Sequence, residues 1–203
     1  AIAHLLDCNH RKKTIMAWSL NTETVMASEE RGTASLDARL GAARKCQEQG
    51  FPLAFHFDPM ILYDNCHADY ARVIQKLFTQ IDPAGIVWIS LGSFRYMPAL
   101  KPLIARRFAG SKIIYHEFVR ALDGKMRYFK PLRIQLYCRI IEAIRDAAPE
   151  VLIYFCMEDD EVWQRCLGHV PSQFGGLPRM LDERAARICD LTGRFPDRSS
   201  SVC

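Results

Sequence analysis

The sequence contains no hydrophobic stretch long enough to cross a membrane. Its longest apolar run, from Gly85 to Gly92, is far shorter than the roughly 20 residues that a membrane-spanning helix needs. The N-terminal residues lack the basic start and long apolar core of a secretion signal. They also lack an initial Met, so we expect the 203 residues to be a piece of a longer protein. These absences predict a cytoplasmic protein that has no membrane partner.

The cysteine spacing of metal-binding motifs is also missing. Eight cysteines are present, but the two closest, Cys156 and Cys166, are ten positions apart, and no Cys-x-x-Cys or zinc-finger spacing occurs. We therefore predict that this chain contributes no metal ligands. Without a secretion signal, scattered thiols are expected to be reduced and buried as small apolar side chains, with disulfides as the less favoured alternative.

The composition is that of a globular domain, and its charge is uneven. Hydrophobic residues make up 49% and charged residues 25%, which excludes intrinsic disorder and fibrous architectures. The net charge is +4, yet the segment 101–146 alone holds eleven Lys and Arg against four carboxylates. One basic segment is typical of proteins that bind a polyanion such as nucleic acid. A solvated basic helix face would give the same count, so composition leaves both interpretations open.

Apolar patterning predicts an α/β fold. Strands are expected at residues 14–21, 51–58 and 85–92, with amphipathic helices at 35–50 and 68–81. Ser35 is the expected N-cap of the first of these helices, and Pro59 is expected to end the second strand. This alternation is typical of a parallel sheet, and three strands are too few to close a barrel. Residues 1–110 are therefore predicted to form part of a (β/α) barrel.

The pattern changes after the third strand. Asp123-Gly124 lies between two extended segments, 113–120 and 126–129, and predicts a β-hairpin. A long helix opened by Pro131 and a last buried strand at 151–157 are expected next. We assign residues 111–165 to the basic hairpin, the long helix and the last strand packed on the barrel. Residues 166–203 are expected to be an irregular tail with a short helix at 181–191.

Candidate functional residues lie near strand ends, where parallel α/β proteins gather their ligands. This rule nominates polar residues of three predicted strands: Ser19, Asn21, His56, Asp58, Ser90, Ser93 and Arg95. His56 and Asp58 are two positions apart on an extended chain, so their side chains point to the same face. A histidine beside a carboxylate can transfer protons or bind a polar substrate, which makes these the candidate catalytic residues. The simpler interpretation, favoured by spacing alone, is an interior histidine hydrogen-bonded to a neighbouring strand. An aldolase-like use of the pair would need a phosphate or carbonyl site, for which there is no signal.

The hairpin is the second candidate site. Aromatic residues Tyr128 and Phe129 are interleaved with five cations: Arg120, Lys125, Arg127, Lys130 and Arg133. Cations hold phosphates, aromatic rings stack on bases, and a two-stranded ribbon fits a groove of DNA. Edge hairpins are also charged simply to prevent aggregation, but that purpose does not need aromatic residues. The hairpin therefore favours nucleic-acid contact.

Four segments carry a resemblance to a known family: TASLDARL at 33–40, GFPLAFHFDP at 50–59, MRYFKPLR at 126–133 and VLIYFCM at 151–157. Together they make residues 4–160 similar to the C-terminal half of spore photoproduct lyase and its radical-SAM relatives. The resemblance implies a partial barrel of the radical SAM type. It also implies S-adenosyl-L-methionine and a [4Fe-4S] cluster as cofactors, and repair of a thymine-dimer lesion in damaged DNA by a radical reaction.

The resemblance also suggests roles for individual residues. Ser19 matches a serine that hydrogen-bonds the cofactor, with Asn21 as its companion, and the pair Arg127-Tyr128 matches the hairpin residues that pry at the lesion. The cluster motif Cys-x-x-x-Cys-x-x-Cys of the family is not in this sequence. We therefore expect the cluster ligands on a missing N-terminal half of the barrel, and this chain alone to be inactive and to expose an unpaired sheet edge.

Two points stay open at this stage. His56 and Asp58 stand where the family has apolar residues, so the substrate of this divergent relative is not fixed by the resemblance. The alternative function is that of a non-catalytic nucleic-acid-binding protein that uses only the hairpin.

Overall fold

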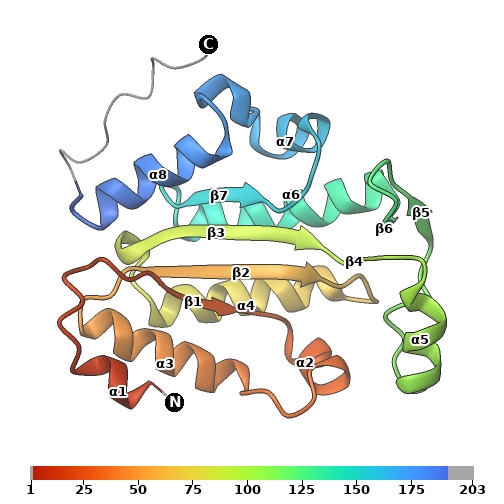
Figure 1. Ribbon diagram of the computed structural model, residues 1–203, viewed down its shortest axis with the longest axis horizontal. Coiled ribbons are helices and arrows are strands. Elements are labelled where there is room, and N and C mark those ends of the chain that lie inside the picture. Colours follow the sequence, from red (N-terminus) through yellow and green to blue (C-terminus); the bar gives the residue numbers. More distant parts are fainter. Residues whose placement is uncertain (1, 192–203) are drawn as a thin grey trace.

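A computed structural model describes residues 2–191 of the chain. Its centre is an open four-stranded sheet in the order β1-β2-β3-β7 (Figure 1), formed by Met16–Ser19, Leu53–Met60, Ile86–Ser93 and Leu152–Phe155. All three neighbouring pairs are parallel, as the alternation of strands and helices predicts. Because β1 and β7 lie at the two edges, the sheet does not close on itself within the described residues.

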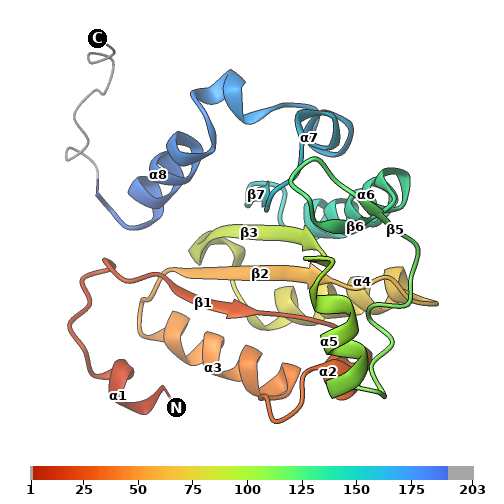
Figure 2. The same ribbon diagram turned by 45° about the vertical axis from the view of Figure 1, so that its right-hand side comes forward.

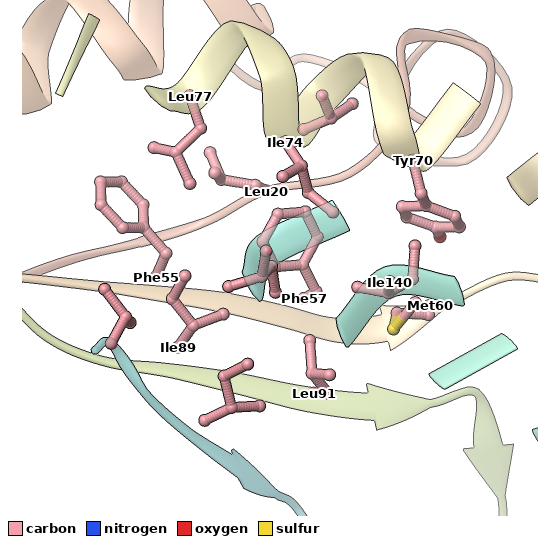
Figure 3. Packing of buried hydrophobic residues seen from close by; sticks show 14 of the residues in the cluster. Leu20, Phe55, Phe57, Met60, Tyr70, Ile74, Leu77, Ile89, Leu91 and Ile140 are labelled. Carbon is pink, nitrogen blue, oxygen red and sulfur yellow. The ribbon is translucent and has the colours of Figure 1, made fainter. Parts of the chain in front are cut away.

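Three long helices cover one face of this sheet: α3 (Leu36–Glu48), α4 (Cys66–Gln80) and α6 (Lys130–Ala147) (Figures 1 and 2). Figure 3 shows Phe55 and Phe57 of β2 directed toward α4, where they meet Ile74 and Leu77. All four of these side chains are buried. The alternate residues of each strand therefore face the opposite side of the sheet, which we call the open face.

The helix boundaries follow local sequence signals. The hydroxyl of Ser35 accepts a hydrogen bond from the Ala38 amide at 3.2 Å, which confirms the predicted N-cap of α3. Pro131 lies in the first turn of α6, as expected. The shorter elements are α1 (Ala3–Leu6), α2 (Glu23–Glu29), α5 (Leu100–Arg107), α7 (Asp160–Leu167), α8 (Leu177–Ile188) and the 3-10 turns η1 (Pro83–Gly85) and η2 (Pro171–Phe174).

The predicted hairpin is present and belongs to a second, antiparallel sheet. Its strands are β5 (Phe118–Arg120) and β6 (Met126–Tyr128), joined by the turn at Asp123-Gly124, where Gly124 has a φ of +78°. The sequence did not predict β4 (Arg95–Tyr96), which pairs with β6 directly after β3 ends. This pairing connects the hairpin to the carboxyl end of the main sheet.

Two expectations about where regular structure ends need correction. Pro59 does not end the second strand, because β2 continues to Met60. The register between β2 and β3 shifts between Phe57 and Met60, and such irregularities accommodate a residue that has no amide hydrogen to donate. The region after residue 166 is also more ordered than expected, since α8 spans twelve residues and Arg184 donates to the carbonyls of Ile86 and Val87. Residues 192–203 of the expected tail lie outside the described residues, and the three-part domain division stays a prediction.

None of the helices that the structure describes is both long and apolar enough to span a bilayer. The seven cysteines among the described residues are free thiols. Cys46, Cys66 and Cys189 are buried, as expected of small apolar side chains, whereas Cys8 is exposed.

A buried ion pair joins α6 to the segment that follows β7. The guanidinium of Arg133 donates to both carboxylate oxygens of Glu158 at 3.0 Å, and the two side chains are only 6% and 1% exposed. The Tyr137 hydroxyl donates to the same carboxylate at 2.8 Å, and Arg133 also donates to the Tyr128 carbonyl at 2.6 Å. Because each buried charge is compensated chiefly by the other, removal of one partner leaves an unpaired charge in the interior.

We therefore predict that Glu158→Ala lowers the free energy of unfolding by about 3–5 kcal/mol, measured by urea denaturation. The control is Glu142→Ala, which breaks an exposed pair with Arg139 on the same helix and should cost less than about 0.5 kcal/mol. Equal effects of the two substitutions would contradict a structural role for the buried pair.

Candidate functional site

Four polar side chains form a row across the open face of the main sheet. The strand register pairs Ser19 with His56, His56 with Ser90, and Ser90 with Tyr154. Paired residues of neighbouring parallel strands point to the same side, so the four side chains lie next to one another. Position near a strand end nominated Ser19, His56 and Ser90. It gave no reason to include Tyr154, which comes from a strand more than sixty residues later.

His56 has one ring nitrogen bound to the sheet and one directed away from it. Its Nδ1 lies 2.6 Å from the Ser90 hydroxyl oxygen, which is the predicted contact of an interior histidine with a neighbouring strand. Nε2 has no hydrogen-bond partner among the described residues and is not sealed from solvent. Burial lowers the pKa of His56, and the negative charge of Asp58 opposes this shift only in part. The ring is therefore a neutral group that can bind a ligand through Nε2.

Asp58 lies one row further along the open face and is held by Arg95. The guanidinium donates to both carboxylate oxygens, at 3.0 and 3.2 Å, and donates to the Cys156 sulfur at 3.2 Å. Burial raises the pKa of the Cys156 thiol. The carboxylate fits here because Gly92 has no side chain, and a Cβ at that position would lie 2.6 Å from Asp58.

His56 and Asp58 thus share a face, as predicted, but they do not form an acid–base pair. The carboxylate is bound by a cation instead of the imidazole, so its charge is already compensated. This arrangement suits recognition of a polar ligand better than transfer of a proton.

The two candidate cofactor-binding residues differ in their surroundings. Ser19 is exposed, and its side chain makes no hydrogen bond to any described residue. It lines a groove of about 480 Å³ along the edge strand β1, together with small residues such as Ala34 and Ala38. The hydroxyl is therefore available to a ligand.

Asn21 does not line this groove, and its expected role as a companion of Ser19 stays a prediction. Its side chain is 3% exposed, donates to the Pro59 carbonyl at 3.0 Å, and accepts hydrogen bonds from the Tyr70 hydroxyl and the Thr22 amide. These bonds use the amide to join the end of β1 to the end of β2. The sequence shows that Asn21 follows a strand but cannot show that its partners are already within the protein.

The expectation that Arg127 and Tyr128 contact nucleic acid is not supported by their positions. Arg127 is 7% exposed and donates to Asp123 at 2.6 Å and to the Met157 carbonyl at 2.8 Å. Tyr128 is fully buried, and its hydroxyl accepts a hydrogen bond from the Leu62 amide. Both side chains therefore join the hairpin to neighbouring segments of the chain, and their burial removes them from the surface.

Lys125 and Lys130 are also paired with carboxylates. Lys130 lies 2.8 Å from Asp159 and 2.7 Å from Glu161, and Lys125 lies 3.8 Å from Asp123. The partner of Lys125 is near in the sequence, but a count of basic residues could not reveal that the distant Asp159 and Glu161 lie beside Lys130. The hairpin is therefore not the free basic surface that its sequence suggests.

No three His, Cys, Asp or Glu side chains among residues 2–191 lie close enough together to hold a metal ion. The exposed hydroxyl of Ser19 is a group that can hydrogen-bond a small molecule.

An open parallel sheet with helices on one face and a polar row on the other defines a partial α/β barrel. Solved structures place it in the radical SAM type. A spore photoproduct lyase mutant with bound AdoMet and dinucleoside spore photoproduct matches with a TM-score of 0.70 and 26% identity, over 76% of this chain and 48% of that one. A spore photoproduct lyase complexed with the dinucleoside lesion matches with a TM-score of 0.68.

Sequence comparison then identifies the family. A family model described as spore photoproduct lyase matches residues 1–133, and the chain belongs to this family. It is 32% identical over 121 residues to spore photoproduct lyase of Geobacillus sp. (strain Y412MC61), and 29% identical over 131 residues to that of Bacillus subtilis (strain 168). These matches cover 59% and 64% of this chain but only 36% of each relative, so the chain corresponds to part of them.

We predict that His56 makes stability depend on pH. Its pKa in the folded chain lies below the ordinary 6.5, so below pH 6.5 the unfolded chain takes up the proton more readily. The stabilisation is therefore complete above about pH 6.5 and is lost as the pH falls toward the folded-state pKa. His56→Gln removes this titration, so the decline in free energy of unfolding between pH 7 and pH 5 should be smaller, measured by urea denaturation.

The matched control is His4→Gln on the exposed helix α1, which should decline with pH as the unchanged chain does. A decline that is the same in all three proteins would show that His56 is not the group responsible.

Proposed function

We propose that this chain is the rear part of a radical-SAM enzyme that repairs a thymine-dimer lesion in DNA, as its relatives named spore photoproduct lyase do. The observation that carries the proposal is the polar row on the open face of a sheet whose fold and family are those of spore photoproduct lyase. Support also comes from the solved relative that holds both AdoMet and the dinucleoside lesion.

The proposed cofactor-binding residue is Ser19. When bound, S-adenosyl-L-methionine and a reduced [4Fe-4S] cluster supply a carbon radical that can remove a hydrogen atom from the substrate. The exposed hydroxyl of Ser19 would hydrogen-bond the cofactor next to His56, its partner in the strand register. Asn21 would act indirectly, because its side chain joins the end of β1 to the end of β2.

We assign substrate positioning to His56 and Asp58. Nε2 of His56 is free to hydrogen-bond a polar group, and the ion-paired carboxylate of Asp58 holds Arg95 at the same face. A neutral imidazole and a paired guanidinium can hold the edge of a base without carrying a net charge into the site. Both residues are therefore proposed as positioning residues that act on the substrate and not as a proton-transfer pair.

We propose that this chain pairs with a front half of the barrel. Within the described residues β1 pairs only with β2, so its other edge is available for a further parallel strand. We propose that the preceding half pairs there and brings the cluster ligands, and that this chain alone is inactive. A cytoplasmic location stays a prediction that fits free thiols and a DNA substrate. The alternative of a purely DNA-binding hairpin loses support because the hairpin cations are paired.

The function is tested in the longer protein that contains this chain. With its cluster reduced and S-adenosyl-L-methionine present, it should convert the dinucleoside spore photoproduct to two thymines, detected by chromatography. Cleavage of the cofactor without any conversion of this lesion would show that the enzyme acts on another substrate.

The role of Ser19 is tested by binding. Ser19→Ala in the longer protein should weaken S-adenosyl-L-methionine roughly 3- to 10-fold in equilibrium titration, because one hydrogen bond is worth about 0.5–1.5 kcal/mol. Ser28→Ala removes an exposed hydroxyl of α2 and serves as the control, with no expected change. If both variants bind the cofactor as the unchanged protein does, Ser19 is not a cofactor contact.

A further inference from the structure

A second group of exposed cations has no compensating carboxylates, and one of its members, Arg120, belongs to strand β5 of the hairpin. Five exposed cations between residues 97 and 122 make no ion pair with any described residue, and we call them the α5 surface: Lys101, Arg106, Arg107, Lys112 and Arg120. The same stretch of sequence contains one carboxylate, Glu117. By contrast, Lys125, Arg127 and Lys130 are all bound by acidic side chains.

Helix α5 lies on the side of the carboxyl ends of β2 and β3; Asp58 is near that end, whereas His56 and Ser90 of the polar row lie in the middle of their strands. The arrowheads of β2 and β3 point toward the side on which α5 lies, in both Figure 1 and Figure 2. No residue of α5 is buried, so its charged side chains are accessible around the helix. The segment after α5 is fixed to the body of the protein, since the Ser111 hydroxyl donates to Glu29 at 2.6 Å and Ile114 is fully buried.

We propose that the α5 surface binds the phosphate backbone of duplex DNA and so brings a lesion to the open face of the sheet. The proposal rests on the proposed function for the identity of the polyanion. Charge complementarity carries it: a cation without a carboxylate partner keeps its full charge for a phosphate, whereas a cation in an ion pair has its charge already compensated. DNA contact is thereby assigned to α5 and its flanking segments instead of to Lys125, Arg127 and Lys130 of the hairpin.

Phosphate contacts position a duplex but do not read its sequence. The α5 surface should therefore bind undamaged and lesion-bearing duplexes alike, and recognition of the lesion should depend on the open face. A dinucleoside lesion has no flanking phosphates, so its repair should not require the α5 surface.

The binding test compares two charge reversals of equal size. Arg106→Glu/Arg107→Glu changes the α5 surface, and Lys45→Glu/Arg139→Glu changes exposed cations of α3 and α6 by the same total charge. Affinity for a fluorescent undamaged duplex is measured by anisotropy between 50 and 200 mM salt. The α5 variant should lose at least tenfold in affinity, and the slope of log K against log salt should become shallower by about two, one unit per lost phosphate contact. The control should stay within about twofold of the unchanged chain.

Three results would overturn the proposal. They are equal weakening by both variants, binding by the α5 variant that matches the unchanged chain, and no salt-dependent binding by the unchanged chain.

A repair assay separates this proposal from the proposed function. In the longer protein, the α5 variant should repair the dinucleoside lesion at the normal rate and lose at least tenfold in repair of the same lesion within a duplex at limiting concentration. Normal repair of both substrates would contradict the α5 surface alone. Failure of the unchanged protein on the dinucleoside would contradict the proposed function itself.

Discussion

The burial of alternate residues of β2 and β3 beneath α4 and α6 determines where this protein can perform chemistry. Phe55 and Phe57 must face the helices because their burial contributes much of the apolar area removed from water. Since side chains alternate along a strand, His56 and Asp58 are then required to face the other side. A slip of one residue would bury the imidazole and the carboxylate and expose two phenyl rings, so one packing constraint fixes both the core and the polar row.

Signals that act within a few residues of the chain predicted their part of the fold correctly. Ser35 caps α3, Pro131 opens α6, and Asp123-Gly124 turns the hairpin, because each depends on backbone geometry close in sequence. The parallel direction of the strands also followed from local patterns, namely the alternation of strands with helices. The short strand β4 escaped prediction, because two residues carry no periodicity and its stability comes from pairing with β6.

The sequence predicted the site only to the extent that it predicts which face of a strand each side chain occupies. Alternation placed His56 and Asp58 together, and family resemblance drew attention to Ser19. Neither could reveal that Arg95 binds the Asp58 carboxylate. Nor could they reveal that the side chain of Asn21 is hydrogen-bonded to Pro59 and Tyr70, because tertiary packing brings these partners together. The hairpin shows the same limit: its cations were visible in the sequence, but the acidic residues that pair with Lys130 come from the next strand–helix connection.

The close approach of Asp58 to Gly92 links two positions on neighbouring strands. The carboxylate occupies the space that any side chain at residue 92 would need, and only glycine leaves it. A larger residue at 92 therefore requires the acid at 58 to move or to be replaced by something shorter, and Arg95 then loses its ion-pair partner. Across relatives, such paired replacement would mark the lineages in which this corner of the barrel holds a charge.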